Sequence, residues 1–235
     1  MSFPPRLNQD LLERIRLVAD ELSASLPEAF DIASLSTKAK LPFKALTLRE
    51  SLIHRASELA DTALDLIDSR RFIPATIIAR ALMETTGLLY WLHHRVESAV
   101  KAGQVGDLDD FLMRGLVGDK LDDGEDDIVA LNAMSGIDRV SRDEKDLPVT
   151  FREMYDWLCE FTHPNWGGVM GAYSKVDRQN WRVTFGSRRD PKDWEFLEAP
   201  LHRSLWVFRD RYNDMARFFP AFIALCEEDL ESQDT

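Results

Sequence analysis

The sequence predicts an all-α protein, a single-domain helical bundle with one small β-hairpin insertion near residues 167–187. Apolar residues recur at steps of three and four through most of the chain, which places them on one face of a helix. Strand-like alternation appears in one place, where Trp181, Val183 and Phe185 alternate with polar residues. No linker rich in Pro, Gly or Ser divides the 235 residues, so we expect one domain over 1–235 with its core at about 45–225.

The first half of the chain carries the apolar stripes of several helices. Thr47 and Glu50 have the spacing of a capping box that opens the second of them. Pro74 suits the first turn of the third helix, and Gly103 lies just beyond its end. This third helix is the most apolar and is expected at the centre of the bundle. An acidic loop at 119–127 separates the fourth expected helix from the fifth. The expected helices cover about 6–26, 48–68, 73–101, 108–117 and 126–142.

A shorter helix follows at about 150–163. Thr150 and Glu153 form a second capping box at its start. Pro164 ends it, because the proline ring disfavours helical geometry at the preceding residue. The sequence therefore places His163 on the last turn of this helix.

A hairpin and a long helix complete the chain. The segment from Val169 to Lys175 is expected to pair with the strand around Trp181 to Phe185. The final helix begins near Pro200 and keeps an apolar seam as far as Cys226. Pro220 lies within this seam and should kink or briefly break the helix.

The charge of the chain is unevenly distributed. A net charge of −12 argues against general nucleic-acid binding, because that affinity comes from neutralising phosphates with Lys and Arg. Residues 107–127 have a local balance of −7, whereas residues 175–192 have a balance of +4. The acidic segment repels anions, and the basic segment following the histidine could hold one.

Composition and motifs exclude several classes of protein. Charges interrupt the apolar stretches before the roughly 18 residues that span a bilayer, and the N-terminus does not read as a secretory leader, so we expect a cytoplasmic protein with no membrane partner. The two cysteines lack CxxC spacing and the five histidines show no HExxH, so we expect no metal and no cofactor. No phosphate-binding glycine loop or GxSxG elbow occurs, which removes the main support for kinases and serine hydrolases.

The central helix carries a charged pair on an apolar face. Arg80 and Glu84 share this face with Gly87. Such a pair is costly unless other helices supply partners, and we expect the Glu84 carboxylate within hydrogen-bond or one-water reach of either Tyr155 or His163. Two interpretations stay open, a buried ion pair that fixes helix register and a pair that lines a pocket. Gly87 favours close approach by another backbone or by a ligand.

Two segments together carry a family resemblance. The segments RALMETTGLLYWL (80–92) and YDWLCEFTHPN (155–165) resemble a family of uncharacterised bacterial helical proteins related to the HEPN superfamily. Its R-x-x-x-E helix and Y-x-x-L-x-x-x-x-H-P segment match Arg80, Glu84, Tyr155, Leu158, His163 and Pro164. The resemblance implies a bacterial helical protein and covers roughly residues 45–225, but it carries no established reaction.

Many HEPN proteins are metal-independent ribonucleases, which gives a second interpretation. They use an R-x(4–6)-H motif, usually across a homodimer, and Arg49 and His54 have this spacing. Glu50 departs from the Asn, Asp or His that usually follows the arginine. In a toxin or phage-defence ribonuclease, His163 or His54 would take the proton of the 2′-hydroxyl and Arg80 or Arg49 would stabilise the phosphate charge.

The leading hypothesis is a binding or regulatory module rather than an enzyme. Its pocket would lie around Arg80, Glu84, Tyr155 and His163 and would hold an anionic or nucleotide-like ligand. Further ligand contacts are expected from Asn165 and Trp166 after the histidine and from Arg178 and Arg182 in the basic hairpin, since aromatic and basic side chains suit a ring beside a phosphate. RNA is an alternative ligand. A third hypothesis treats these polar groups as purely structural.

Overall fold

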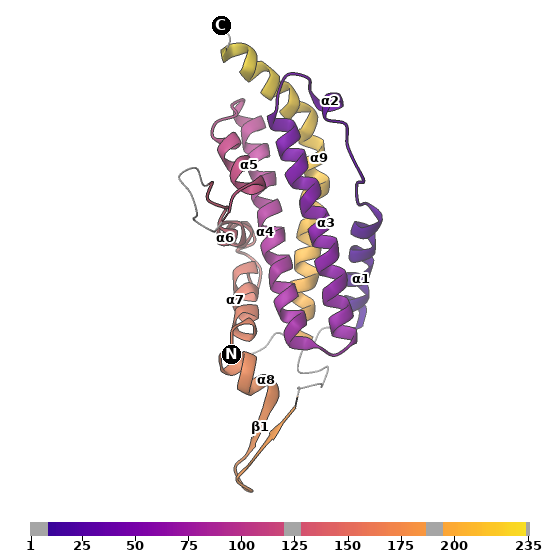
Figure 1. Ribbon diagram of the computed structural model, residues 1–235, viewed down its shortest axis with the longest axis vertical. Helices are drawn as coiled ribbons and strands as arrows, with labels where there is room; N and C mark the ends of the chain where they lie inside the picture. Colours follow the sequence, from indigo (N-terminus) through magenta and orange to yellow (C-terminus); the bar gives the residue numbers. More distant parts are fainter. Residues whose placement is uncertain (1–8, 120–127, 187–194, 234–235) are drawn as a thin grey trace.

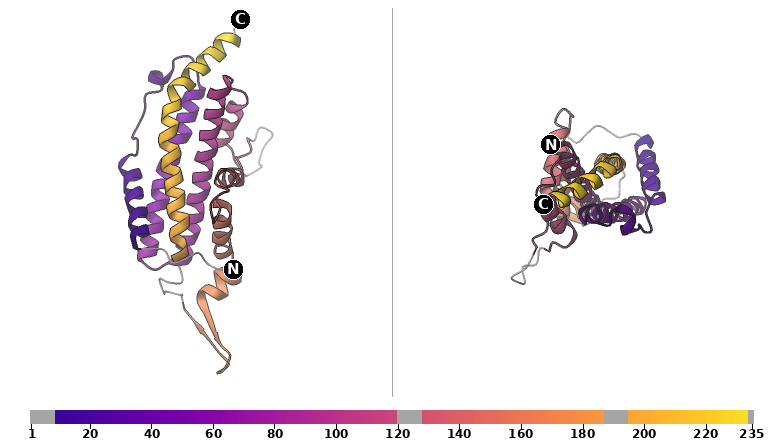
Figure 2. Two further views of the ribbon diagram at one scale, coloured as in Figure 1. Left: turned by 180° about the vertical axis from the view of Figure 1, so that it is seen from behind. Right: turned by 90° about the horizontal axis from the view of Figure 1, so that it is seen from above.

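Three long helices run side by side through the centre of the protein (Figures 1 and 2). They are α3 (Leu41–Asp68), α4 (Phe72–Ala102) and α9 (Glu198–Gln233). The computed structural model describes residues 9–119, 128–186 and 195–233. Within them, the fold is an all-α bundle with one two-stranded hairpin at its end, as the sequence predicts (Figure 1).

Shorter helices cover this central layer. Helix α1 (Gln9–Ala24) packs on α3 and α9, and α5 (Leu108–Leu116) packs on α3. Helices α6 (Ala133–Asp143) and α7 (Phe151–Thr162) follow one another along α4 (Figure 1). A single helical turn, α2 (Ile32–Leu35), lies on the connection between α1 and α3. Among these shorter helices, α6 and α7 make the main contacts with α4.

Helix α4 is long and apolar enough to span a membrane by length and composition, although the sequence analysis expects no such segment. Among the described helices it alone meets that test. Its apolar side chains pack against α3, α9, α6 and α7, with Leu82, Met83 and Leu92 fully buried. Its composition is therefore that of the core helix at the centre of the bundle.

Two glycines bring α4 and α6 into backbone contact. A Cβ atom on Gly136 would lie 2.4 Å from the carbonyl oxygen of Gly87, and one on Gly87 would lie 2.9 Å from the Ile137 nitrogen. Neither space admits a methyl group. Gly87 thus serves the approach of another backbone, one of the two roles expected for it.

The start of α3 differs from the prediction. The helix begins at Leu41, about two turns before Thr47, with Pro42 in its first turn. The Thr47 hydroxyl donates to the Phe43 carbonyl within the helix, and Glu50 is buried in an ion pair. The capping box expected at Thr47 and Glu50 is therefore wrong, because the helical pattern extends further upstream.

The boundaries of α6 and α9 also differ. Helix α6 begins at Ala133, where the Asn132 side chain accepts a hydrogen bond from the Met134 amide. Most of the expected acidic loop, residues 120–127, lies outside the described part of the chain. Helix α9 continues through Pro220, so of the kink or break expected there the break is absent. The capping box at Thr150, the Pro74 start and the left-handed Gly103 cap of α4 are confirmed.

The hairpin starts later than expected. Residues 169–173, predicted as strand, belong to a π-helical turn, η1 (Trp166–Met170), and to α8 (Gly171–Tyr173). Strands β1 (Ser174–Asp177) and β2 (Arg182–Phe185) then pair antiparallel, with Ser174 opposite Phe185. The hairpin projects from one end of the bundle (Figures 1 and 2).

Candidate functional site

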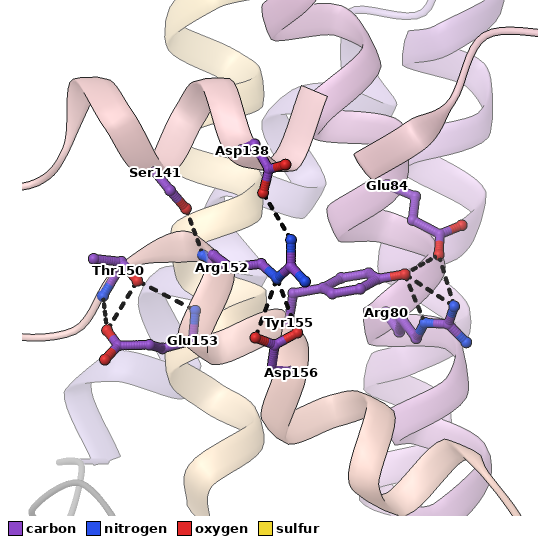
Figure 3. Close-up of polar contacts among 9 residues, drawn as sticks. All are labelled: Arg80, Glu84, Asp138, Ser141, Thr150, Arg152, Glu153, Tyr155 and Asp156. Carbon is purple, nitrogen blue, oxygen red and sulfur yellow. Dashed lines mark hydrogen bonds and ion pairs between the residues drawn. The ribbon is translucent and has the colours of Figure 1, made fainter. Parts of the chain in front are cut away.

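Arg80, Glu84 and Tyr155 form one hydrogen-bonded network between α4 and α7 (Figure 3). The Tyr155 hydroxyl donates to Glu84 Oε1 at 2.8 Å and accepts from Arg80 Nε and Nη2 at 3.0 and 2.9 Å. Arg80 Nη2 also lies 3.2 Å from Glu84 Oε1. The expected contact between Glu84 and Tyr155 is therefore present, and the hydroxyl serves both charged groups at once.

The network lies at the edge of the core. Tyr155 is only 4% exposed, whereas the side chains of Arg80 and Glu84 are 27% and 33% exposed. Burial and the bond to Glu84 raise the pKa of Tyr155 to about 12, so its hydroxyl stays neutral. Burial acts to lower the pKa of Arg80, but its bond to Tyr155 and the surrounding groups outweigh burial and leave that pKa raised. The three side chains thus provide hydrogen-bond partners for one another without a ligand.

His163 does not join this network. It is the first residue after α7, with an extended backbone, and its side chain is exposed. Within the described residues, only its backbone groups form hydrogen bonds, the amide to Cys159 and the carbonyl from Asn165. No hydrogen bond between Glu84 and His163 is found in the described part of the chain, so Tyr155 is the one of the two expected partners that Glu84 contacts.

A second polar network lies beside the first and joins α6 to α7 (Figure 3). Arg152 forms ion pairs with Asp138 at 2.8 Å and Asp156 at 2.9 Å. Its amide donates to the Ser141 hydroxyl at 2.6 Å. The network fixes the first turn of α7 against α6, with the Thr150 cap immediately before it.

A basic cavity of about 780 Å³ opens at these same elements, and we call it the α6 cavity. Four of its lining residues are bases and one is an acid, Asp138, which is already paired with Arg152. Trp91 supplies an aromatic wall from α4. The complete lining is Trp91, Ser135, Asp138, Arg139, Ser141, Arg142, Lys145 and Arg152.

Arg139 is the unusual residue of this cavity. Its Nε is buried and has no hydrogen-bond partner within the described chain. Burial, followed by the nearby charge of Arg142, lowers the pKa of its guanidinium, although an arginine stays charged at neutral pH. Arg139 also lines a smaller neighbouring cavity of about 260 Å³ that includes His94 and Arg95. The half-buried Arg139 thus lies near the cations Arg142 and Arg95 as well as the Asp143 carboxylate, and a further anion would favour its charged form.

This cavity is not apparent from the sequence, because acids and bases alternate along residues 138–152. Four acids balance the four bases in that range, so no basic cluster is apparent. In the fold, Asp143 accepts from the Tyr90 hydroxyl at 2.7 Å, and Glu144 pairs with Arg203 at 2.7 Å. These contacts give two of the four acids partners other than the bases that line the cavity. The sequence does contain one sign of the cavity, because steps of four and three place Ser135, Arg139 and Arg142 on one face of a helix.

The alternative pair, Arg49 and His54, does not converge. Arg49 is buried, with its guanidinium 3.5 Å from the centre of the Tyr212 ring and an ion pair to Glu50. His54 is exposed, and its Nε2 lies 2.9 Å from the Pro27 carbonyl. Five helical residues apart, the two side chains leave α3 about 140° apart. The R-x(4–6)-H motif therefore forms no joint site within one chain.

The remaining predicted ligand contacts are separate from both networks. The Asn165 side chain accepts from the Gly168 amide at 3.1 Å and caps η1. A Cβ on Gly168 would lie 2.2 Å from the His163 carbonyl oxygen, so this segment is a packed turn rather than an open loop. Trp166 is 73% exposed, and Arg178 and Arg182 lie on the exposed hairpin. In the described part of the chain, Arg80 is bound to Tyr155 and Glu84 and not to these residues.

Other chemistries find little support among the described residues. Burial raises the pKa of the Cys159 thiol, which disfavours a thiolate next to His163. No group of three His, Cys, Asp or Glu residues in residues 9–119, 128–186 and 195–233 could hold a metal ion. Comparison of the chain with protein-family models, curated proteins and solved structures finds no match.

Proposed function

We propose that this protein is a binding module for a small anionic, phosphate-bearing ligand, and that the ligand occupies the α6 cavity. One observation carries the proposal: the buried Nε of Arg139 lacks a partner at a cavity that is also lined by Arg142 and Lys145. A buried donor without an acceptor is costly, and a phosphate oxygen would supply the missing acceptor. The proposal thus moves the expected anion site from Arg80 and Tyr155 to the adjacent face of α6.

The cavity also suits a ligand with a ring. Trp91 lies at its wall beside the guanidinium groups, and a planar ring with an attached phosphate needs this combination of apolar and cationic contacts. Ser135 and Ser141 add hydroxyl groups on the same side. A nucleotide-like ligand is the class that uses all of these groups together.

The network of Arg80, Glu84 and Tyr155 supports this function indirectly. It holds α7 against α4, and α7 supplies Arg152 to the cavity wall. The HEPN-like interpretation rests on the resemblance of that same network, and a binding or regulatory role fits it better than catalysis because Arg80 and Glu84 are already satisfied within the chain.

Calorimetric titration with inorganic phosphate, pyrophosphate and ATP in the presence of chelator tests the proposal. Binding should weaken at least about tenfold in Arg142→Gln, since a charge-assisted hydrogen bond contributes roughly 1.5–3 kcal/mol. Arg178→Gln is the matched control, because it removes the same charge from the hairpin, away from the cavity. Equal weakening in both variants would indicate a general charge effect. Loss in Arg178→Gln alone would return the site to the hairpin.

A further inference from the structure

The hairpin formed by β1 and β2 has two chemically different faces. The register places Val176 opposite Val183 and Ser174 opposite Phe185, so these pairs share one face. The other face carries Lys175 opposite Thr184 and Asp177 opposite Arg182. The ribbon is therefore amphipathic, although neither face is covered by the bundle.

The apolar face and the turn are open to solvent. Trp181 at the turn is 95% exposed and Phe185 is 80% exposed, while Val176 and Val183 are 55% and 43% exposed. Trp181 also adopts a positive φ of 50°, a conformation that a bulky side chain rarely takes. A two-stranded hairpin is marginal in water without a cover for its apolar face. An occupant that covered the apolar face would therefore stabilise the ribbon.

The charge and position of the hairpin restrict that occupant. Lys175, Arg178 and Arg182 make the ribbon cationic, against Asp177, whose carboxylate is bound to Asn180 in the turn. The rest of the chain is acidic, with a net charge of −12 overall. The hairpin points away from the bundle near one end of its long axis (Figure 1). Four strand residues extend about 13 Å, which exceeds the roughly 8 Å Debye length in cells. The tip can therefore meet an anionic surface while the acidic body stays screened from it.

We propose that the hairpin docks on an anionic lipid surface, with Trp181 and the apolar face at the interface and the basic side chains among the headgroups. Indole and phenyl rings partition to the membrane interface, and Lys and Arg bind anionic headgroups beside them. The contact is peripheral and adds a membrane partner that the sequence analysis did not expect. It is independent of the anion site in the α6 cavity.

Charge and chemistry disfavour the other occupants. A second copy would bring two chains with a net charge of −12 together, and packing hairpin on hairpin would also oppose like charges. A single-stranded nucleic acid stacks on rings, but Val176 and Val183 lie at the centre of the face, between Phe185 and the turn that carries Trp181, and offer none. A lipid interface accepts both aliphatic and aromatic groups.

Co-sedimentation of the full chain with phosphatidylcholine vesicles, with and without phosphatidylserine, tests the proposal. Wild-type protein should bind only vesicles containing phosphatidylserine, and binding should fall as salt rises. Trp181→Ser should weaken binding at least about tenfold, whereas Trp206→Ser removes a half-exposed tryptophan from the body and should leave binding unchanged. Replacing Lys175, Arg178 and Arg182 with Gln should weaken binding by roughly fivefold per residue.

Each remaining outcome has a defined meaning. No binding to either vesicle, or equal loss in the Trp181 and Trp206 variants, overturns the proposal. A concentration-dependent dimer that Trp181→Ser abolishes in analytical ultracentrifugation would identify a second copy as the occupant. RNA binding with the same dependence on Trp181 would identify a nucleic acid. Arg142→Gln should bind vesicles normally, so failure of the cavity proposal and failure of the hairpin proposal are distinguishable.

Discussion

The Tyr155 hydroxyl donates to Glu84 across the α4–α7 interface at 2.8 Å while it accepts from Arg80. Two other tyrosines make related contacts. Tyr212 donates to Glu50 beneath the guanidinium of Arg49, and Tyr90 donates to Asp143 below that of Arg211. In each case a tyrosine on one helix contacts an acid and an arginine that lie on other helices, both on the same helix in the first two cases and on two helices in the third. The arrangement neutralises charges within the bundle and explains why residues resembling a catalytic motif also serve its packing.

Removing the Tyr155 hydroxyl should destabilise the fold. Tyr155→Phe keeps the buried ring but leaves Glu84 and Arg80 with only their mutual contact, and we expect a loss of about 1–2 kcal/mol in the free energy of unfolding. Urea denaturation measures this loss. Tyr173→Phe, at the exposed base of the hairpin, is the control and should change little. A loss confined to the control would contradict the structural role of the network.

The glycine contact between α4 and α6 should not tolerate a methyl group. In Gly136→Ala the new Cβ would meet the Gly87 backbone at 2.4 Å, so the helices must separate, at a cost of about 1–3 kcal/mol or more. On an open helical face the same change would stabilise by up to about 1 kcal/mol. Thermal denaturation shows whether Gly136→Ala lowers or raises the stability of the fold, with Ser135→Ala on the same helix as the control. Stabilisation would show that α6 can shift freely.

The pair formed by His93 and Asp214 should make stability depend on pH. The hydrogen bond from His93, which is 2% exposed, lowers the pKa of Asp214 below its ordinary value of 3.8. A lowered carboxyl pKa stabilises the fold above the unfolded value, and this stability is lost as pH falls through the folded value. Asp214→Asn should therefore be less stable than wild type near neutral pH, with a difference that shrinks below about pH 4. Urea unfolding at several pH values measures the stability difference between the variant and wild type. A difference that grows in acid would contradict the prediction.

The Arg139 side chain should affect stability and binding in opposite directions. Arg139→Gln removes a half-buried cation with an unpartnered nitrogen, so the ligand-free fold should gain up to about 1–2 kcal/mol. The same change should weaken phosphate binding. Thermal melts with and without pyrophosphate measure both effects on one sample. Destabilisation without any change in binding would instead make Arg139 a structural residue.

Cleavage of single-stranded RNA in excess chelator tests the ribonuclease alternative. We expect no specific cleavage, since Arg49 is bound to Glu50 and Tyr212 while His54 points to another face of α3. Each of His54→Ala, His163→Ala and Arg80→Ala should match wild type, once shown to be folded by circular dichroism. Chelator-resistant cleavage lost in His54→Ala would establish the alternative pair across a dimer. Cleavage lost only in His163→Ala would assign catalysis to the end of α7.

The sequence was sufficient wherever structure depends on nearby residues. The helical spacing of apolar residues predicted the all-α class. Thr150 and Glu153 predicted the start of α7, and Gly103 predicted the end of α4. A partner for Glu84 could also be named, because a charge on an apolar helix face needs one and Tyr155 was a candidate on another helix. These inferences follow from hydrogen bonds and periodicities that span a few residues.

Only the tertiary structure decided which polar groups remain available for a ligand. Arg49 has the spacing of a catalytic arginine, but the fold commits it to Glu50 and Tyr212. The bases of α6 lie among acids in the sequence, but contacts with Tyr90 and Arg203 hold two of those acids and leave the Arg139 nitrogen unpartnered. Pairing between helices depends on how they pack, because a side chain is satisfied by whichever group the fold brings beside it. Local sequence therefore determined the helices, and packing determined the cavity.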